Sequence, residues 1–430
     1  MSRLATLSFT LLLAGGASAQ AFTSWFTGNT QDAAPQPLGG VCMMGGASEF
    51  DPAMQWFLDR ANGGDVLVLR ASGSDGYNDY MYSDLGGINS VETIRFDAVG
   101  AATDPYVAER IQKAEAIWFA GGDQWNYASY WRNTPVQTLI NEAITQRNIA
   151  IGGTSAGMAI LGGCYFSAQF GSITSSFALT NPMDQAVAVD CTPFLNVPFM
   201  AATITDTHYD NPDRRGRHFT FLARMAQMGD SMAYGIACNE YVAVCVAPDG
   251  IAHVYGEYPD YQEFAYFLRV NCMPPVSPET CAPGQPLTWD RGGEAVKVYK
   301  VPGVPGGDHW FNLNDHESGS GGAWEDWSAV AGLFTTQAGN APDCLPTVTG
   351  ARDTEQVALD WDPLAGIAGI AGSSPAAELQ VLGLDGRMIP GRRSTAGDVQ
   401  QVRLPHDAHG LFLLRLTEAG RSRVWRLARP

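Results

Sequence analysis

The segment Gly153-Thr154-Ser155-Ala156-Gly157 constrains the fold of this chain more than any other. It follows the largely apolar run 148–152 and precedes the apolar residues 158–161. This order predicts a strand, a sharp turn and a helix, because glycines on both sides of a serine permit a strained turn and close packing. Such a turn exposes the Ser155 hydroxyl at the carboxyl edge of a sheet. It also points the next helix's N-terminus at the place where an oxyanion would form.

Segments with strand and helix character alternate around this turn. Strands are predicted at 65–70, 91–96, 116–120 and 149–152, helices at 52–61, 106–113 and 136–146, and a further apolar segment at 40–44. This alternation is typical of βαβ units and of a mostly parallel sheet with helices on both faces. We therefore predict an α/β fold whose site lies outside the carboxyl ends of the strands, where residues 121–124 and Ser155 both fall.

The C-terminal part has a different pattern. A strand followed by a turn is predicted over 377–387 and a second strand at 399–404, and 411–416 with 423–428 predicts a hairpin. The segment 363–375 is rich in Gly, Ala, Ser and Pro, which is typical of a linker. The predicted organisation is a signal peptide (1–19), a spacer (20–37), an α/β domain (38–345), a linker (346–375) and a small β-rich appendage (376–430).

The first residues have the pattern of a secretory signal. Arg3 supplies a positive charge, 4–13 is largely apolar but too short to span a bilayer, and Ala17-Ser18-Ala19 predicts cleavage before Gln20. No other stretch approaches about 20 consecutive apolar residues, so no transmembrane helix is expected. A formal net charge of −18 argues against the basic face of a nucleic-acid binder. We therefore expect a secreted or cell-surface protein without a nucleic-acid partner.

Export would permit disulfides among the eight cysteines. Cys272 and Cys281 bracket a Pro-rich loop and are the first predicted pair, with Cys164 and Cys191 as the second. Cys42 lies in an apolar strand and is predicted to be a buried thiol. No cysteine or histidine spacing fits a zinc site, so neither a metal nor another cofactor is expected.

A serine nucleophile needs a base to take its proton, and seven histidines compete for this role. His208 follows the apolar run 201–205, and the end of a strand would hold a base rigidly. The base in turn needs an orienting carboxylate. Glu240 lies between two apolar stretches, where an unpaired charge is costly and a partner imidazole would offset that cost. Asp206 is the rival acid, and its closeness to His208 in sequence says nothing about their distance in space.

Four segments, in this order, resemble the cyanophycinase family of serine peptidases. They are 119–124 (FAGGDQ), 152–159 (GGTSAGMA), 206–217 (which begins DTHY) and 234–240 (YGIACNE). The resemblance covers about 38–301. It implies a class I glutamine-amidotransferase-like fold in which serine replaces the cysteine nucleophile. It also implies cleavage of peptide bonds such as the β-Asp-Arg units of a storage polymer.

Carried over to this chain, the resemblance implies a role for each matching residue. Ser155 is the nucleophile, His208 the base and Glu240 the acid. The backbone N–H groups of Gly122 and Ala156 are the oxyanion donors. The implied substrate-binding residues are Gln124, Asp206, Arg214 and Arg217; guanidinium groups suit a substrate carboxylate. Pro212 and Asp213 interrupt the arginine-rich stretch of the cyanophycin-cleaving members. This departure affects the identity of the substrate more than the peptidase activity.

The segment 404–427 resembles the C-terminal sorting domain of type IX secretion, which implies secretion machinery as a partner. Two other functions stay open. An esterase or lipase of α/β-hydrolase type also uses G-x-S-x-G, but it usually orders its residues as serine, acid, histidine, unlike the order here. A non-catalytic binding protein would have no structural need to keep all three groups. We therefore expect a secreted serine peptidase that cleaves an Asp-containing peptide or isopeptide through an acyl-enzyme.

Overall fold

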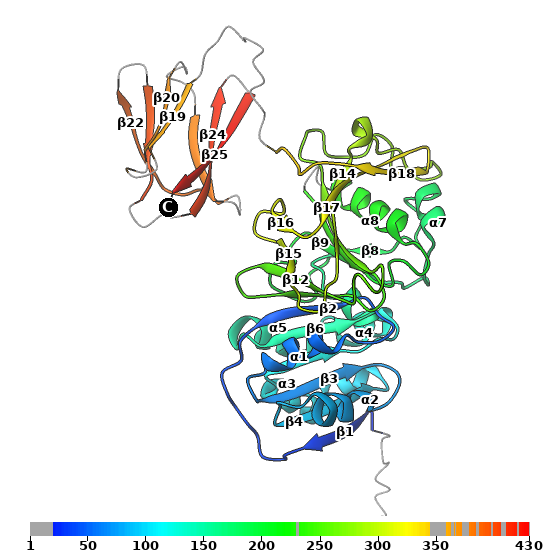
Figure 1. Ribbon diagram of the computed structural model, residues 1–430. Coiled ribbons are helices and arrows are strands. Elements are labelled where there is room, and N and C mark those ends of the chain that lie inside the picture. The colour runs from blue at the N-terminus through cyan, green and yellow to red at the C-terminus, as the bar shows by residue number, and fades with distance from the viewer. Residues whose placement is uncertain are drawn as a thin grey trace, which may run out of the picture. The chain divides into compact units, whose positions relative to one another are not determined.

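The computed structural model describes residues 20–228, 232–344, 358–362, 365, 367–371, 378–383, 387–396, 399–405, 410–418 and 421–429. The chain divides into two compact units, one that ends at Pro342 and one that begins at Asp343. The first contains two large sheets with helices around them, whereas the described residues of the second form strands (Figure 1). The predicted signal peptide lies outside the described residues.

A ten-stranded sheet lies at the centre of the first unit. Its five strands β4, β3, β5, β6 and β2 run parallel, and antiparallel strands extend it at both ends, which confirms the predicted mostly parallel α/β sheet. In spatial order the strands are β1 (Phe22–Gly28), β4 (Ser90–Phe96), β3 (Asp65–Arg70), β5 (Ala116–Phe119), β6 (Ala150–Thr154), β2 (Gly40–Met44), β11 (Ala243–Val246), β12 (Ile251–Tyr255), β15 (His309–Asn312) and β16 (Gly319–Ser320).

Helices cover both faces of this sheet, because successive residues of a strand point to opposite sides. In β3, Leu67 and Leu69 pack in one cluster with the apolar residues of α3, α4 and α5. Val66 and Val68 pack in another cluster with those of α1. The helical segments of this region are α1 (Asp51–Asp59), α2 (Gly76–Asp79), the π-helix η1 (Tyr80–Leu85), the 3-10 helix η2 (Val99–Thr103), α3 (Pro105–Lys113), α4 (Gln124–Trp131), α5 (Pro135–Gln146) and α6 (Ala156–Ala159).

A second, six-stranded sheet follows and is antiparallel except for one pair. Only β9 and β10 run parallel, and they end side by side at Asp206 and Cys238. Its strands, in spatial order, are β18 (Leu333–Ala338), β17 (Ala323–Val330), β14 (Val296–Pro302), β13 (Phe264–Val270), β10 (Tyr234–Cys238) and β9 (Thr203–Asp206). Helix α8 (Arg215–Gln227) packs with this sheet's apolar residues, and α7 (Ser175–Thr180), η3 (Arg291–Gly293) and the short pair β7 (Tyr165–Phe166) and β8 (Val189–Asp190) complete the unit.

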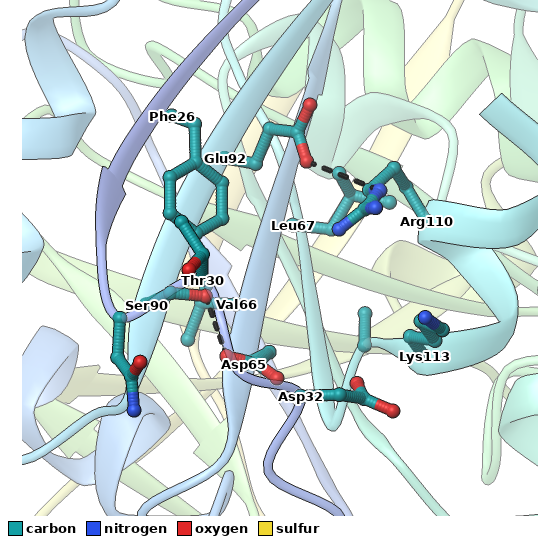
Figure 2. A pocket seen from close by; sticks show the side chains of 12 residues that line it. Phe26, Thr30, Asp32, Asp65, Val66, Leu67, Ser90, Glu92, Arg110 and Lys113 are labelled. Atoms are coloured by element: carbon teal, nitrogen blue, oxygen red, sulfur yellow. Dashed lines mark hydrogen bonds and ion pairs between the residues drawn. The ribbon is translucent and has the colours of Figure 1, made fainter. Parts of the chain in front are cut away.

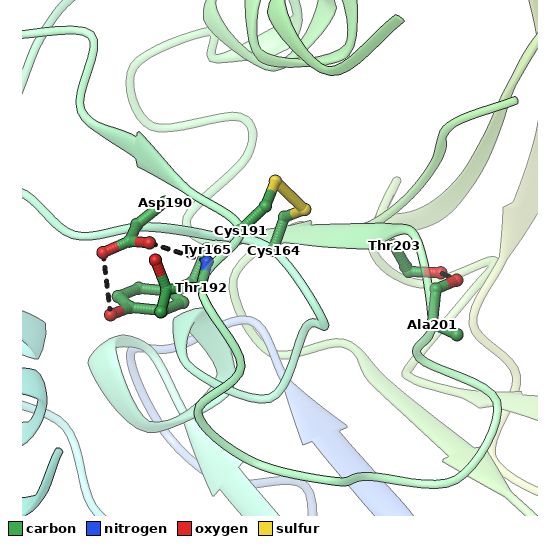
Figure 3. Close-up of a disulfide and its surroundings, with 7 residues drawn as sticks. All are labelled: Cys164, Tyr165, Asp190, Cys191, Thr192, Ala201 and Thr203. Carbon is green, nitrogen blue, oxygen red and sulfur yellow. Dashed lines mark hydrogen bonds between the residues drawn. A yellow bond between two sulfur atoms is a disulfide. The ribbon is translucent and has the colours of Figure 1, made fainter. Parts of the chain in front are cut away.

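A disulfide joins Cys164 and Cys191 beside the β7–β8 pair (Figure 3), which confirms the second predicted pairing. The first predicted pairing is wrong. Cys281 is a buried free thiol whose sulfur lies 3.8 Å from that of Met183, whereas Cys272 is disulfide-bonded, as is Cys344. Cys272 and Cys281 are close in sequence across a Pro-rich loop, but Cys281 packs in the apolar cluster that also contains residues of α8. Cys42 is a buried thiol, as predicted.

The second unit contains two antiparallel sheets that share one apolar cluster. The first consists of β19 (Ala358–Asp362), β20 (Ile367–Ala371), β23 (Val399–Arg403) and β22 (Arg392–Ala396) in spatial order. The second consists of β21 (Glu378–Gly383), β24 (Gly410–Glu418) and β25 (Arg421–Arg429). In the part of the chain that the structure describes, no helix has the length and apolarity needed to cross a membrane.

The two segments predicted to be a spacer and a linker contain strands. Phe22–Gly28, predicted as part of a spacer, is the edge strand β1 and pairs antiparallel with β4 along its whole length. Its aromatic and threonine residues favour a strand despite the lack of clear alternation. Strands β19 and β20 lie within the predicted linker, where Ala368 and Ile370 are fully buried. Ala368 and Ile370 alternate along β20 with a period of two and belong to the apolar cluster that the two sheets share.

Candidate active site

Ser155 occupies the predicted turn between β6 and α6, with φ of 51° and ψ of −116°. Both flanking glycines are required by close packing. A Cβ atom on Gly153 would lie 2.6 Å from the backbone carbonyl carbon of Gly157, and one on Gly157 would lie 2.0 Å from the backbone oxygen of Phe119. The turn thus presses the start of α6 against the end of β5 and holds Ser155 at the carboxyl edge of the sheet.

Three side chains meet at this edge in a continuous line of hydrogen bonds. Ser155 Oγ lies 2.8 Å from His208 Nε2, and His208 Nδ1 lies 2.6 Å from Glu240 Oε1. The hydrogen bond from His208 lowers the pKa of Glu240, so this group stays a carboxylate. If Nδ1 carries the proton that Glu240 accepts, Nε2 is free to accept the proton of Ser155. The side chains of His208 and Glu240 are 25% and 19% exposed, so a substrate can reach the site.

Three consecutive backbone carbonyl groups, from the last residue of β2 and the two residues that follow it, hold the elements of this site. Met44 O accepts from Ser155 N at 3.1 Å, Gly45 O accepts from His208 N at 2.8 Å, and Gly46 O accepts from Tyr241 N at 3.1 Å. A Cβ atom on Gly46 would lie 2.4 Å from the imidazole ring of His208. Sequence reasoning missed this segment. Its only signal is the Gly45-Gly46 pair directly after a strand.

Backbone strain accompanies the three groups. Ser155 and His208 have positive φ angles of 51° and 45°, and so does Tyr241, next to Glu240, at 64°. Each of these residues carries a Cβ atom, for which this region of φ is costly, and such strain is typical of functional sites held in place by their surroundings.

The predicted oxyanion donors lie on the loop after β5 (Gly122) and at the start of α6 (Ala156). A Cβ atom on Gly121 would be 3.6 Å from Ser155 Cβ, which places the loop after β5 beside the serine. Within the described residues, the backbone N–H groups of Gly122 and Ala156 have no hydrogen-bond acceptor in the protein. Helix α6 has only four residues, so its dipole is small and individual N–H groups are the available donors.

The predicted residue Gln124 begins helix α4. Asp123 caps this helix by accepting from Trp125 N at 2.9 Å, which accounts for the acidic residue of the motif. Gln124 Nε2 donates to the backbone oxygen of Phe166 at 3.3 Å and so connects α4 with β7. Its contact with a substrate stays a prediction.

Asp206 and Arg217 are both buried, and they pair with each other. Arg217 Nε and Nη2 donate to the two carboxylate oxygens of Asp206 at 2.9 and 2.5 Å, and both residues are at most 3% exposed. Arg217 Nη1 donates to Ser172 Oγ and to the backbone oxygen of Ile173. The expectation that Asp206 and Arg217 bind substrate is therefore corrected. The pair fixes the end of β9, two residues before His208.

Arg214 differs from Arg217 in being less buried and in having no carboxylate partner among the described residues. It is half-buried, and its Nη1 donates to the backbone oxygen of Thr207 at 3.0 Å. No carboxylate group among the described residues lies within ion-pair distance of Arg214. The charge of Arg214 helps to lower the pKa of Glu240, so Arg214 lies at the same edge of the sheet as Ser155, His208 and Glu240.

His218 gives the protein a predicted sensitivity to acid. It is fully buried on α8, with Nδ1 3.1 Å from the Tyr209 hydroxyl, and burial lowers its pKa to about 4. The unfolded chain would bind this proton near pH 6.5, so stability is retained above that pH and lost as pH falls toward 4. Between pH 7 and pH 5 this single group should cost about 2 kcal/mol. Urea unfolding of His218→Gln should show a correspondingly smaller loss between these pH values. An unchanged loss would contradict the prediction.

One small hollow lies far from this chemistry, at the amino ends of the parallel strands (Figure 2). It is lined by Asp65 and Ser90 at the starts of β3 and β4 and by Arg110 and Lys113 at the end of α3. Its volume of about 60 Å³ holds a few water molecules but not a peptide. In the described residues, no group of three or more histidine, cysteine, aspartate or glutamate side chains is arranged to hold a metal.

Comparison with known proteins finds cyanophycinases among the relatives of this chain. A cyanophycinase from Synechococcus elongatus is 25% identical over 227 residues, which cover 51% of this chain and 66% of that protein. One from Geminocystis herdmanii (strain PCC 6308) is 25% identical over 149 residues, which cover 35% and 49%. The chain thus spans about half to two thirds of the length of these relatives.

A solved peptidase structure from an acI-B1 Actinobacterium aligns with 52% of this chain and 90% of its own length, at 15% identity and a TM-score of 0.37. Residues 41–247 match the model of peptidase family S51, and this range contains Ser155, His208 and Glu240. The chain therefore resembles peptidase family S51 over these residues, and cyanophycinases are among its relatives.

Proposed function

We propose that this protein is a secreted serine peptidase that hydrolyses an Asp-containing peptide or isopeptide bond, of the β-Asp-Arg kind, through an acyl-enzyme. The observation that carries the proposal is the line of hydrogen bonds from Ser155 Oγ through His208 to Glu240. Nothing in the packing of two sheets requires a serine, an imidazole and a carboxylate to meet at the ends of three different strands.

In the proposed mechanism, His208 Nε2 takes the proton of Ser155 as Oγ attacks the scissile carbonyl carbon. Negative charge develops on the carbonyl oxygen, where the free N–H groups of Gly122 and Ala156 can donate to it. His208 then gives its proton to the leaving amine, and an ester on Ser155 remains. A water molecule, deprotonated by His208, hydrolyses this ester and restores the serine. Glu240 stabilises the imidazolium form of His208 in both steps.

The proposed recognition of an acidic substrate group rests on Arg214. Its guanidinium group has free donors at the edge of the site and suits a carboxylate, the group that an aspartyl residue presents. Arg214→Ala should lower kcat/KM for an aspartyl peptide by about tenfold or more, since a hydrogen bond to a charged group contributes about 1.5–3 kcal/mol. The rate on a neutral p-nitrophenyl ester should change little.

Arg215→Ala is the matched control for this prediction. Arg215 is the adjacent cation, but its guanidinium group is already paired with Asp213 at 2.7 Å. Arg215→Ala should therefore leave the activity on both substrates unchanged. Equal losses on the peptide and the ester after Arg214→Ala would show that Arg214 supports the structure and does not select the substrate.

A substrate panel tests the proposal as a whole. Purified protein is incubated with cyanophycin, isoaspartyl dipeptides, α-aspartyl peptides and p-nitrophenyl esters, with the Ser155→Ala variant alongside. We expect cleavage of at least one aspartyl or isoaspartyl peptide by the wild type alone. Cleavage of esters without any peptide would favour an esterase. Cleavage of none, together with an unreactive Ser155, would favour a binding protein.

Secretion and the sorting role of the C-terminal unit are part of the same proposal. The signal-like residues 1–19 and the presence of disulfides support export, because disulfides persist in oxidising compartments. The second unit has its own apolar cluster and contributes none of the three residues of the site. Normal release of a chain that ends near Thr347 from its native host would reject the sorting role.

A further inference from the structure

The turn that follows His208 forms hydrogen bonds with both the backbone and the side chain of Glu240. Asp210 Oδ1 accepts a hydrogen bond from the backbone N–H of Glu240 at 3.0 Å. Asn211 Nδ2 donates to Glu240 Oε2, the oxygen that His208 leaves free, at 3.4 Å. The turn is tied to the base as well, because Asn211 N donates to the backbone oxygen of His208 at 3.2 Å. One turn therefore carries the base and contacts the acid at two further points.

We propose that Asp210 and Asn211 are positioning residues, which hold Glu240 so that one oxygen faces His208 Nδ1. The proposal rests on the proposed function of Ser155, His208 and Glu240. Glu240 needs such a restraint because it follows β10 on a loop and its side chain is 19% exposed. A carboxylate held by one hydrogen bond can rotate, and the imidazole would then lose its orientation. With the backbone fixed by Asp210 and the second oxygen fixed by Asn211, rotation breaks a further contact.

The charges around this turn suit the role. An aspartate carboxylate only accepts hydrogen bonds, so Asp210 matches the Glu240 N–H without competing for the His208 proton. Arg214 lies close enough to lower the pKa of Glu240 further, after the hydrogen bonds from His208 and Asn211. Glu263 lies just before β13, where burial raises its pKa to about 7, and the charges of Glu257 and Asp210 raise this pKa too.

The test measures how fast a fluorophosphonate probe labels Ser155 in the full chain, across pH 5–8. Labelling depends on the activated serine and not on the identity of the peptide substrate. Asp210→Ala should label about 10- to 100-fold more slowly, the range that follows from a small misplacement of a catalytic group. Asp210→Asn keeps an acceptor oxygen and should label close to the wild-type rate. Asp213→Ala, in the same turn but paired with Arg215, is the matched control and should also resemble the wild type.

Variants of Asn211 provide a second test, the pH profile of labelling, which a purely structural role of Asn211 would not change. Asn211→Asp replaces the donor with a negative charge beside Glu240, which favours the imidazolium form of His208. The acidic limb of the labelling profile should therefore move to higher pH. Asn211→Ala should slow labelling without this movement. These two variants also decide the proposal if Asp210→Ala fails to fold, as judged by its thermal unfolding.

The outcomes separate this proposal from the function on which it rests. If the wild type is not labelled at all, the serine is not activated and both proposals fail. If the wild type is labelled but Asp210→Ala labels equally fast, or Asn211→Asp leaves the acidic limb in place, the positioning role alone is overturned.

Discussion

Replacing Ser155 with alanine is expected to abolish turnover, by about 10⁶-fold, and to leave the fold intact. Without the Oγ atom, His208 has no hydroxyl to activate at the end of β6, and no ester can form. Alanine has a Cβ atom like that of serine, so the strained turn and its packing against β5 should persist. Steady-state hydrolysis of the best substrate from the panel measures the loss, with thermal unfolding as the check on folding.

Ser176→Ala serves as the control, because Ser176 is an exposed serine on α7 that does not contact the site. It should retain full activity. His208→Ala and Glu240→Gln should each lower activity strongly, and a double variant of Ser155 with either should be little worse than Ser155→Ala, because the three groups act as one unit. More than a tenth of the wild-type rate in Ser155→Ala would overturn the assignment.

Arg217→Ala is expected to destabilise the protein by about 3–5 kcal/mol, the cost of leaving one partner of a buried ion pair uncompensated. Burial alone would raise the pKa of Asp206, but the charge and hydrogen bonds of Arg217 outweigh it and lower that pKa. After the substitution, Asp206 would be a buried carboxylate that must lose its charge or its packing. Urea unfolding at pH 7 gives the change in the free energy of unfolding.

Arg215→Ala provides the matched comparison for stability. Arg215 and Asp213 also form a close pair, but their side chains are 34% and 54% exposed, and surface pairs contribute about 0–1 kcal/mol. The contrast between two arginines two positions apart isolates the effect of burial. A loss below about 1 kcal/mol for Arg217→Ala, within the range of a surface pair, would contradict the structural role assigned to it.

The central geometry of the site could be predicted because its residues carry local signals. Glycines around Ser155 follow a strand and precede a helix, and His208 follows an apolar run. Glu240 stood out from Asp206 because it lies between two apolar stretches, where a charge needs a partner. In the structure, Glu240 is hydrogen-bonded to His208, and Asp206 accepts hydrogen bonds from Arg217.

Other features depend on contacts that no local pattern reveals. Arg217 has the same composition around it as Arg214, and only the packing of α8 against β9 decides which of the two is buried. The carbonyl groups of Met44, Gly45 and Gly46 act through the backbone, which has no sequence signature. For the edge strand β1, the partner strand β4 lies more than 60 residues away, so pairing at long range overrides an irregular pattern.

The most direct test of the account is to locate the covalent intermediate. The protein is mixed with an activated aspartyl ester, quenched in acid at early times, digested and analysed by mass spectrometry. An acyl group is expected on the peptide that contains Ser155, and it should form and decay at the rate of turnover and be absent from Ser155→Ala. Full hydrolysis with no adduct, or an adduct on another residue that turns over at the same rate, would contradict it.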